Sequence, residues 1–152
     1  MCRRQIQVDH AEKYSKKNGF GTELVYAIMR QESGLMKDAR SGSDAFGLLQ
    51  LKAETASELN KAHEFKTYKD FKSLYDPEIN IAMGTKLIAS HIKEFKGNLV
   101  HVLSAYNAGK NALKRWQEVR FTNDLATDIE MIPYKETRNY NKLVLRNLVL
   151  YK

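Results

Sequence analysis

The sequence contains few residues that cross-link or interrupt a chain. Its 152 residues include one cysteine, Cys2, and two prolines, Pro77 and Pro133. One cysteine cannot form a disulfide within the chain, which excludes a disulfide scaffold. We assign Cys2 no role, since a free thiol at a chain end is a poor candidate nucleophile. The longest apolar run, Leu24–Met29, is far below the roughly 18 residues that a membrane span requires.

The common signatures of metal and phosphate sites are also missing. The four histidines show no His-x-x-x-His or mixed Cys/His spacing, and there is no Asp-rich calcium loop and no glycine-rich phosphate loop. We therefore expect neither a metal nor another cofactor. The first residues, Met1–Gln7, carry charge but no apolar stretch, so no signal peptide is visible.

The composition predicts one globular domain over residues 1–152. Hydrophobic residues make up 43% of the chain and charged residues 28%. Lysine and arginine total 25 against 18 acids, a net charge of +7, which favours a polyanionic partner such as nucleic acid, an anionic envelope polymer or a membrane surface. The bases are scattered, and even the densest stretch, Lys61–Lys72, holds Glu64 and Asp70. A solvated basic surface explains this pattern equally well, and nucleic-acid binding ranks last.

Helical spacing dominates the chain, and alternating β-branched runs are scarce. Thr22 can cap the second helix, Gly34 ends it, and Asp76-Pro77 is a typical helix start. The expected helices are Gln5–Asn18, Glu23–Ser33, Ala53–Asn60, one from Asp76-Pro77 to Gly97, one from Asn98 to Gly109, Lys110–Glu118, and a last one opened by Pro133. We expect an all-α domain, with Lys61–Tyr75 irregular and room for a small hairpin within Lys37–Leu51.

Glu32 is the most informative residue. On a helical wheel, Leu24, Val25, Ile28 and Met29 span an arc of about 140°, and Glu32 falls near its middle. Burial and the negative end of the helix dipole both raise the pKa of such a carboxyl group, which could then act as a general acid near neutral pH.

Two other arrangements of Glu32 remain open from the wheel alone. It could pair with Arg30 or Lys37, or turn out into solvent past the last turn. A glycosidase commonly uses two carboxylates at a defined separation. The candidate second acids, none an obvious partner, are Asp38, Asp44, Asp128 and Glu130. A substrate-assisted mechanism therefore also stays open.

Tyr106 and Asn107 add a phenol and an amide on the same helix face as Leu99 and Leu103. On their own, such groups are more often structural hydrogen-bonding partners than ligands to a substrate.

Several segments together resemble the soluble lytic transglycosylase family, over residues 14–151. Tyr26–Ser33 resembles the helix that ends in the family's catalytic Glu-Ser. The further matching segments are Ser41 with Ala45–Leu51 (AFGLLQL), Thr55-Ala56, Asn80–Leu87 (NIAMGTKL), Ser104–Gly109 (SAYNAG) and Glu130–Tyr140 (EMIPYKETRNY). Each motif alone is weak, but their common order along the chain is highly specific.

The resemblance implies an all-α, lysozyme-like domain of the goose-type lysozyme and SLT kind. It implies cleavage of the MurNAc–GlcNAc β-1,4 bond of peptidoglycan without water, which leaves a 1,6-anhydroMurNAc end. In such enzymes one glutamate acts first as acid and then as base, and here that residue would be Glu32. The substrate supplies the internal nucleophile, so no second acid is needed.

The resemblance also implies roles for other residues. Ser41, Gln50, Tyr106, Asn107 and Glu130 should line the cleft near Glu32. Tyr106 would position Glu32 by its hydroxyl, while Ser41, Gln50 and Asn107 would contact the sugar and its acetamido group. Glu130 would hold substrate or polarise the anhydro step. For the Glu136–Arg138 segment we prefer a structural ion pair at the start of the helix.

Three residues depart from the family pattern. Asp44 stands where the family usually has glycine, Lys52 where it has methionine, and Ala53 where it has proline. A lysine near the cleft could lower the pKa of Glu32, or could bind a carboxylate of a peptide stem. Alternatively, Asp44 and Lys52 could pair with each other.

Two competing functions follow from the same residues. One is a hydrolytic muramidase on the same fold, and the other is a non-catalytic peptidoglycan-binding scaffold domain. For all of these readings the expected partner is the peptidoglycan glycan strand, with no nucleic acid and no transmembrane segment. We expect a monomer, as part of a larger parent protein or envelope machine, in the periplasm or outside the cell.

Overall fold

The computed structural model describes residues 3–152, and Cys2 lies outside them. Within that range the chain forms eight α-helices, one short 3-10 helix and one two-stranded hairpin. In order they are α1 Arg3–Asn18, α2 Thr22–Ser33, β1 Ala45–Phe46, β2 Leu51–Lys52, α3 Ala53–Leu59, η1 Phe71–Tyr75, α4 Pro77–Glu94, α5 Leu99–Ala108, α6 Lys110–Val119, α7 Leu125–Met131 and α8 Lys135–Tyr151. The predicted helical fold with a small hairpin is confirmed.

Several helix ends follow the chemistry expected of them. Gly34 adopts a left-handed φ of 60° and donates its N–H to the carbonyl of Arg30, ending α2. The Asp76 carboxylate accepts hydrogen bonds from the first backbone N–H groups of α4, and the Asn98 side chain caps α5 through His101 N–H.

Other boundaries differ from the prediction. Thr22 is the first residue of α2 rather than its cap, and its hydroxyl lies 2.7 Å from that of Ser15 on α1. The loop expected between Glu118 and Pro133 contains α7, which begins where the Asp124 carboxylate accepts a hydrogen bond from Thr127 N–H. α8 begins at Lys135, not at Pro133. The stretch predicted to be irregular contains η1, capped by Asp70.

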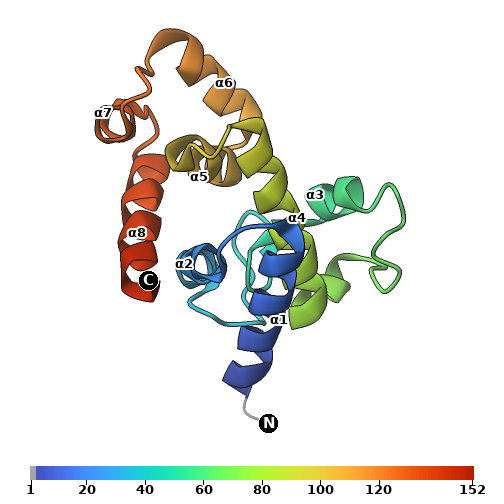
Figure 1. Ribbon diagram of the computed structural model, residues 1–152. Coiled ribbons are helices and arrows are strands. Elements are labelled where there is room, and N and C mark those ends of the chain that lie inside the picture. The colour runs from blue at the N-terminus through green and yellow to red at the C-terminus, as the bar shows by residue number, and fades with distance from the viewer. Residues whose placement is uncertain (1–2) are drawn as a thin grey trace.

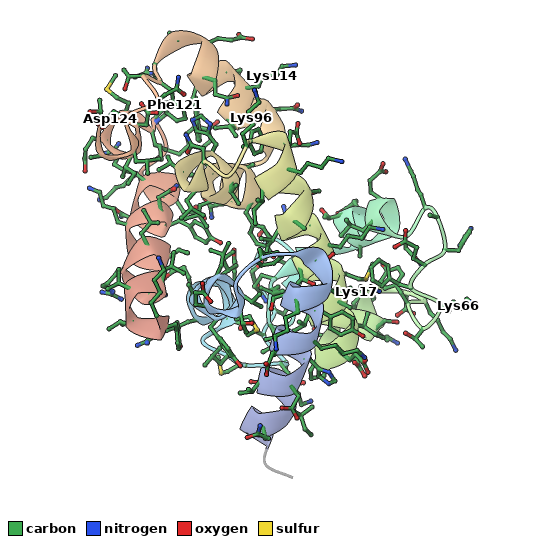
Figure 2. The ribbon with its side chains drawn as sticks, in the orientation of Figure 1. Lys17, Lys66, Lys96, Lys114, Phe121 and Asp124 are labelled. Carbon is green, nitrogen blue, oxygen red and sulfur yellow. The ribbon has the colours of Figure 1, made fainter. Side chains whose placement is uncertain are left out.

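The helices pack around α2 (Figure 1). Figure 1 shows α2 end-on in the centre, with α8 on one side and α1 and α4 on the other. α2 packs mainly against α8, α1 packs against α4, and α5 contacts both α4 and α8. The buried stripe of α2 joins apolar residues of the hairpin loop, α4, α5 and α8 in the main core, which includes Ile28, Leu49, Ile81, Leu103 and Val144. Side chains fill the space between these helices (Figure 2).

A buried amide holds the hairpin against α4. Asn80 accepts a hydrogen bond from Leu49 N–H at 2.8 Å and donates to the carbonyls of Phe46 and Leu74, both at 2.9 Å. Gly47, at a φ of 77°, lies so close that a Cβ would collide with the Asn80 amide and the Leu74 carbonyl. This position therefore requires glycine, and the contact fixes the hairpin against α4.

Candidate active site

A cavity of about 870 Å³ opens between the hairpin, α3, α4, α5 and the starts of α6 and α8. Five of the six residues predicted to form the site lie together on its wall: Ser41, Gln50, Tyr106 and Asn107 join Glu32 there, and Glu130 does not. The cavity is therefore the place where the sequence motifs from distant parts of the chain meet.

Glu32 lies in the last turn of α2, half-buried at the wall of this cavity. Its Oε1 accepts a hydrogen bond of 2.8 Å from the Tyr140 hydroxyl. The pKa of Glu32 is raised from 4.5 to about 7: burial is the main cause, the hydrogen bond from Tyr140 opposes it, and the nearby charge of Glu136 adds to it. A pKa in this range allows the Glu32 carboxyl group to carry a proton near neutral pH.

The alternative pairings of Glu32 are wrong. Lys37 lies 2.9 Å from Asp38 instead, and Glu32 forms no salt bridge with the side chains described, those of residues 5–152. No nearby cation keeps the carboxyl group ionised. A general acid needs this, because it must carry a proton before it can donate one.

The phenol that holds Glu32 is that of Tyr140, not that of Tyr106. The Tyr106 hydroxyl donates to the backbone carbonyl of Leu49 at 2.6 Å and so ties α5 to the hairpin loop. Burial and the charge of Glu32 raise the pKa of both tyrosines well above its usual value, so both remain hydroxyl donors. Tyr140 lies on the apolar stripe of α8, and that pattern alone marks it only as a core residue.

Ser41 and Gln50 shape the loop at the hairpin. The Ser41 hydroxyl accepts a hydrogen bond from Ala45 N–H and lies 3.1 Å from the Ser43 hydroxyl. The Gln50 amide donates to the carbonyls of Ala39 and Gly47, at 3.1 and 2.9 Å. Both side chains thus hold the loop while also lining the cavity.

Asn107 lines the cavity and also joins α5 to α8. Its Oδ1 accepts a hydrogen bond of 2.7 Å from the buried Thr137 hydroxyl. This bond fixes which edge of the amide is an acceptor for the protein, and it leaves the amide N–H₂ as the donor for a ligand.

The structure does not place Glu130 at the cleft. Glu130 is exposed in the last turn of α7 and forms a 2.6 Å salt bridge with Lys142 of α8. The glutamate of the Glu130–Tyr140 segment that lines the cavity is Glu136, in the first turn of α8. Its expected ion pair with Arg138 is absent from the described residues, since positions two apart on a helix point about 200° away from each other.

The expected pairing of Asp44 with Lys52 is also wrong. Asp44 instead accepts two hydrogen bonds from the Arg40 guanidinium, at 2.7 and 3.1 Å. Asp44 has a left-handed φ of 56°, a conformation that glycine adopts freely and aspartate tolerates. Lys52 lines the cavity, and it is not among the groups that shift the pKa of Glu32.

No candidate second acid shares the cavity with Glu32. Asp38 and Asp44 are paired to neighbours outside it, and the fully buried Asp128 accepts hydrogen bonds from the backbone at Thr122 and Asn123. Burial lowers the pKa of the wall residue His91 to about 4, so His91 is neutral near pH 7. Residues 3–152 contain no group of three or more ligands suited to a metal ion.

Known proteins share this arrangement of motifs and helices. The family described as the Transglycosylase SLT domain matches residues 9–129. The chain belongs to this family. Two curated relatives of this SLT domain are the soluble lytic murein transglycosylase of Escherichia coli K12, 31% identical over 95% of the chain, and the putative one of Haemophilus influenzae, 36% identical over 82%.

Solved structures give the same fold. The lytic transglycosylase Slt of Pseudomonas aeruginosa, an inactive mutant with one glutamate changed to glutamine, is 34% identical and covers 99% of the SLT domain with a TM-score of 0.86. A 70-kDa soluble lytic transglycosylase in complex with bulgecin A is 32% identical and covers 94%, with a TM-score of 0.87.

The relatives are much longer than this chain. The SLT domain spans 22% of the Escherichia coli relative, 20% of the Haemophilus influenzae relative and 24% of the Pseudomonas aeruginosa chain. No helix within residues 3–152 has the length and apolar character needed to cross a membrane.

Proposed function

We propose that this SLT domain is a lytic transglycosylase that cleaves the MurNAc–GlcNAc β-1,4 bond of peptidoglycan and leaves a 1,6-anhydroMurNAc end. The observation that carries the proposal is Glu32, a half-buried carboxyl group on the wall of a large cavity, held by Tyr140 and with its pKa raised to about 7. A carboxyl group with that pKa exchanges a proton in both directions near neutral pH.

The chemistry needs one group that is acid and then base. Protonated Glu32 donates its proton to the glycosidic oxygen, and the C1–O bond breaks with its electron pair going to the leaving GlcNAc. The acetamido carbonyl of MurNAc stabilises the cationic C1. The Glu32 carboxylate then takes the proton of the C6 hydroxyl as its oxygen bonds to C1, which closes the anhydro ring and restores the acid.

The protein's other groups bind and orient. The Tyr140 hydroxyl holds Oε1 of Glu32 in one position through both proton transfers, and the Asn107 amide N–H₂ faces the ligand because Thr137 occupies its carbonyl. Burial keeps the pKa of Glu32 high enough for proton donation, and the Glu136 charge raises it in the same direction. The acids other than Glu32 on the cavity wall are Glu54, Glu58 and Glu136, and none is assigned the role of nucleophile here.

The setting of the domain follows from its substrate. We expect it to work where peptidoglycan lies, in the periplasm or outside the cell, with glycan strands as its partner and as one domain over residues 1–152 of a larger protein or machine. The match to only about a fifth of each soluble relative supports this expectation.

Mass spectrometry of digested sacculi tests the proposal. The wild-type chain should release muropeptides with anhydro ends, one water lighter than hydrolysed ends, and Glu32→Gln should release none while still binding sacculi. Glu130→Gln is the matched control, because that glutamate lies outside the cavity, and it should keep the wild-type products. Hydrolysed ends would indicate a muramidase instead, and binding without any soluble product would indicate a scaffold domain.

A further inference from the structure

Of the charged residues on the cavity wall, Lys110 and Glu58 are paired within the protein, whereas Lys52, Glu54 and Glu136 form no salt bridge among residues 5–152. Lys110 lies 3.2 Å from Glu94, and Glu58 lies 2.7 Å from Lys61. Lys52 also lines the cavity, but it has no carboxylate within 4.0 Å among residues 3–152. An ammonium group facing a ligand cavity without a protein counter-ion can take its counter-ion from the ligand.

The hairpin explains why Lys52 has no partner. Asp44, the acid directly before β1, is held by the Arg40 guanidinium at 2.7 Å. Lys52 stands opposite Ala45 in the antiparallel register, and directly opposed residues project their side chains to the same face of a sheet. Ala45 lines the cavity as well, so the solvent-exposed Lys52 lies on the face of the hairpin that borders the cavity.

Two hydroxyl groups share this end of the cavity. Ser41 and Ser43 both line it, and their hydroxyls lie 3.1 Å apart. One of these hydroxyls donates to the other, so one hydroxyl hydrogen remains for a ligand, and the ammonium group of Lys52 at the hairpin adds further donors. These donors suit a carboxylate, which accepts several hydrogen bonds and carries the complementary charge.

We propose that Lys52, with Ser41 and Ser43, binds a carboxylate of the glycan ligand and so determines which strands the domain prefers. This inference rests on the proposed function, since it names a feature of the same substrate. In peptidoglycan the carboxylate has two sources. A bare muramic residue carries one on its lactyl group, and a substituted residue carries others on its stem peptide.

Lys52 affects the binding of the strand and not the rate of the chemical step. Lys52 does not contribute to the raised pKa of Glu32, so its removal leaves the proton donor unchanged. An ion pair in a partly open cavity, supported by hydroxyl donors, gives about a threefold to tenfold gain in affinity. The loss on substitution should therefore fall on Kd and KM, with kcat and the pH profile unchanged.

Isothermal titration with the inactive Glu32→Gln chain tests the proposal without turnover. The probes are three soluble glycan strands. The first carries stem peptides. The second has no stems and a free lactyl carboxylate, and the third has no stems and a lactyl carboxylate converted to a methylamide. Lys52→Met removes the charge at similar length, and Lys52→Arg keeps it. The matched control is Lys66→Met, an exposed lysine on the loop after α3 that points away from the cavity (Figure 2).

The expected result is a threefold to tenfold weaker Kd for Lys52→Met on at least one carboxylate-bearing strand, no change on the methylamide strand, and wild-type affinity for Lys52→Arg and Lys66→Met. A loss confined to stem-bearing strands identifies the stem as the source, and a loss confined to bare strands identifies the lactyl group. Equal losses on all three strands, or no loss on any, would overturn the proposal.

Product analysis separates this outcome from that of the proposed function. If the chain binds strands through Lys52 but releases no anhydro product, the inference about Lys52 holds and the lyase assignment fails. If it releases anhydro product but Lys52→Met binds all three strands as the wild type does, the lyase assignment holds and the inference fails.

Discussion

Replacing Glu32 by glutamine should stabilise the folded chain at neutral and alkaline pH while abolishing catalysis. The folded chain holds the pKa of this carboxyl near 7, and an unfolded glutamate has a value of 4.5. Because the folded state binds the proton more tightly, the stability contributed by Glu32 is fully present below pH 4.5. It is lost as the pH rises towards 7 and beyond.

The magnitude follows from the two pKa values. At about 1.4 kcal/mol for each unit of pKa, the ionised Glu32 costs the folded state about 3 kcal/mol above pH 8 and about 1 kcal/mol near pH 5.5. Glutamine is neutral at every pH and similar in shape, so Glu32→Gln removes this pH-dependent loss. The free energy of unfolding of the variant, relative to wild type, should therefore rise by about 3 kcal/mol between pH 4.5 and pH 8.

Urea unfolding followed by circular dichroism at several pH values measures this difference. Glu64→Gln is the control, because Lys86 at 2.7 Å lowers the pKa of Glu64 and so gives the opposite pH trend. A difference between Glu32→Gln and wild type that stays constant from pH 4.5 to pH 8 would refute the reasoning, because it would mean that Glu32 ionises as an ordinary surface carboxyl group.

Three further substitutions test the surroundings of Glu32. Tyr140→Phe removes the hydrogen bond that holds Oε1 of Glu32, so kcat should fall about tenfold to a hundredfold. Because the same bond lowers the pKa of Glu32, the alkaline limb of the pH–rate profile should move to higher pH. Glu136→Gln removes a charge that raises the pKa of Glu32, so the same limb should move to lower pH, and a shift the other way would contradict the electrostatic account. Gly47→Ala places a methyl group against Asn80 and Leu74 at a φ of 77°, so urea unfolding should show a loss of about 2 kcal/mol or more; an unchanged midpoint would show that the hairpin is not held as described.

Local patterns in the sequence predict most of the helices. Gly34, Asp76 and Asn98 end or begin helices as expected, because the chemistry of a helix end lies within a few residues. α7 was missed because it has only seven residues and no long apolar stripe. Thr22 was misassigned because the partner that its hydroxyl finds, Ser15, belongs to another helix.

In the functional site, too, the sequence predicts the local features and misses those that depend on tertiary contacts. Helical periodicity predicts that Glu32 lies on the buried stripe of α2, and therefore that it is partly buried. The sequence does not predict the hydrogen-bond partner of Glu32, because Tyr140 is 108 residues away and its place on the stripe of α8 marks it only as a core residue. Glu130 and Glu136 lie in the same motif, and only the start of α8 decides that the second of them faces the cavity. The assignments of Tyr106 and Asp44 failed for the same reason, since hydrogen-bond partners depend on tertiary geometry.

The most direct measurement is the titration of the Glu32 side chain itself. In a chain labelled with ¹³C at the glutamate carboxyl carbons, the resonance that disappears in Glu32→Gln belongs to this residue. Its chemical shift should titrate with a midpoint near pH 7. A midpoint near 4.5, the ordinary value of a glutamate, would contradict the claim that the fold keeps this carboxyl group protonated for its first proton transfer.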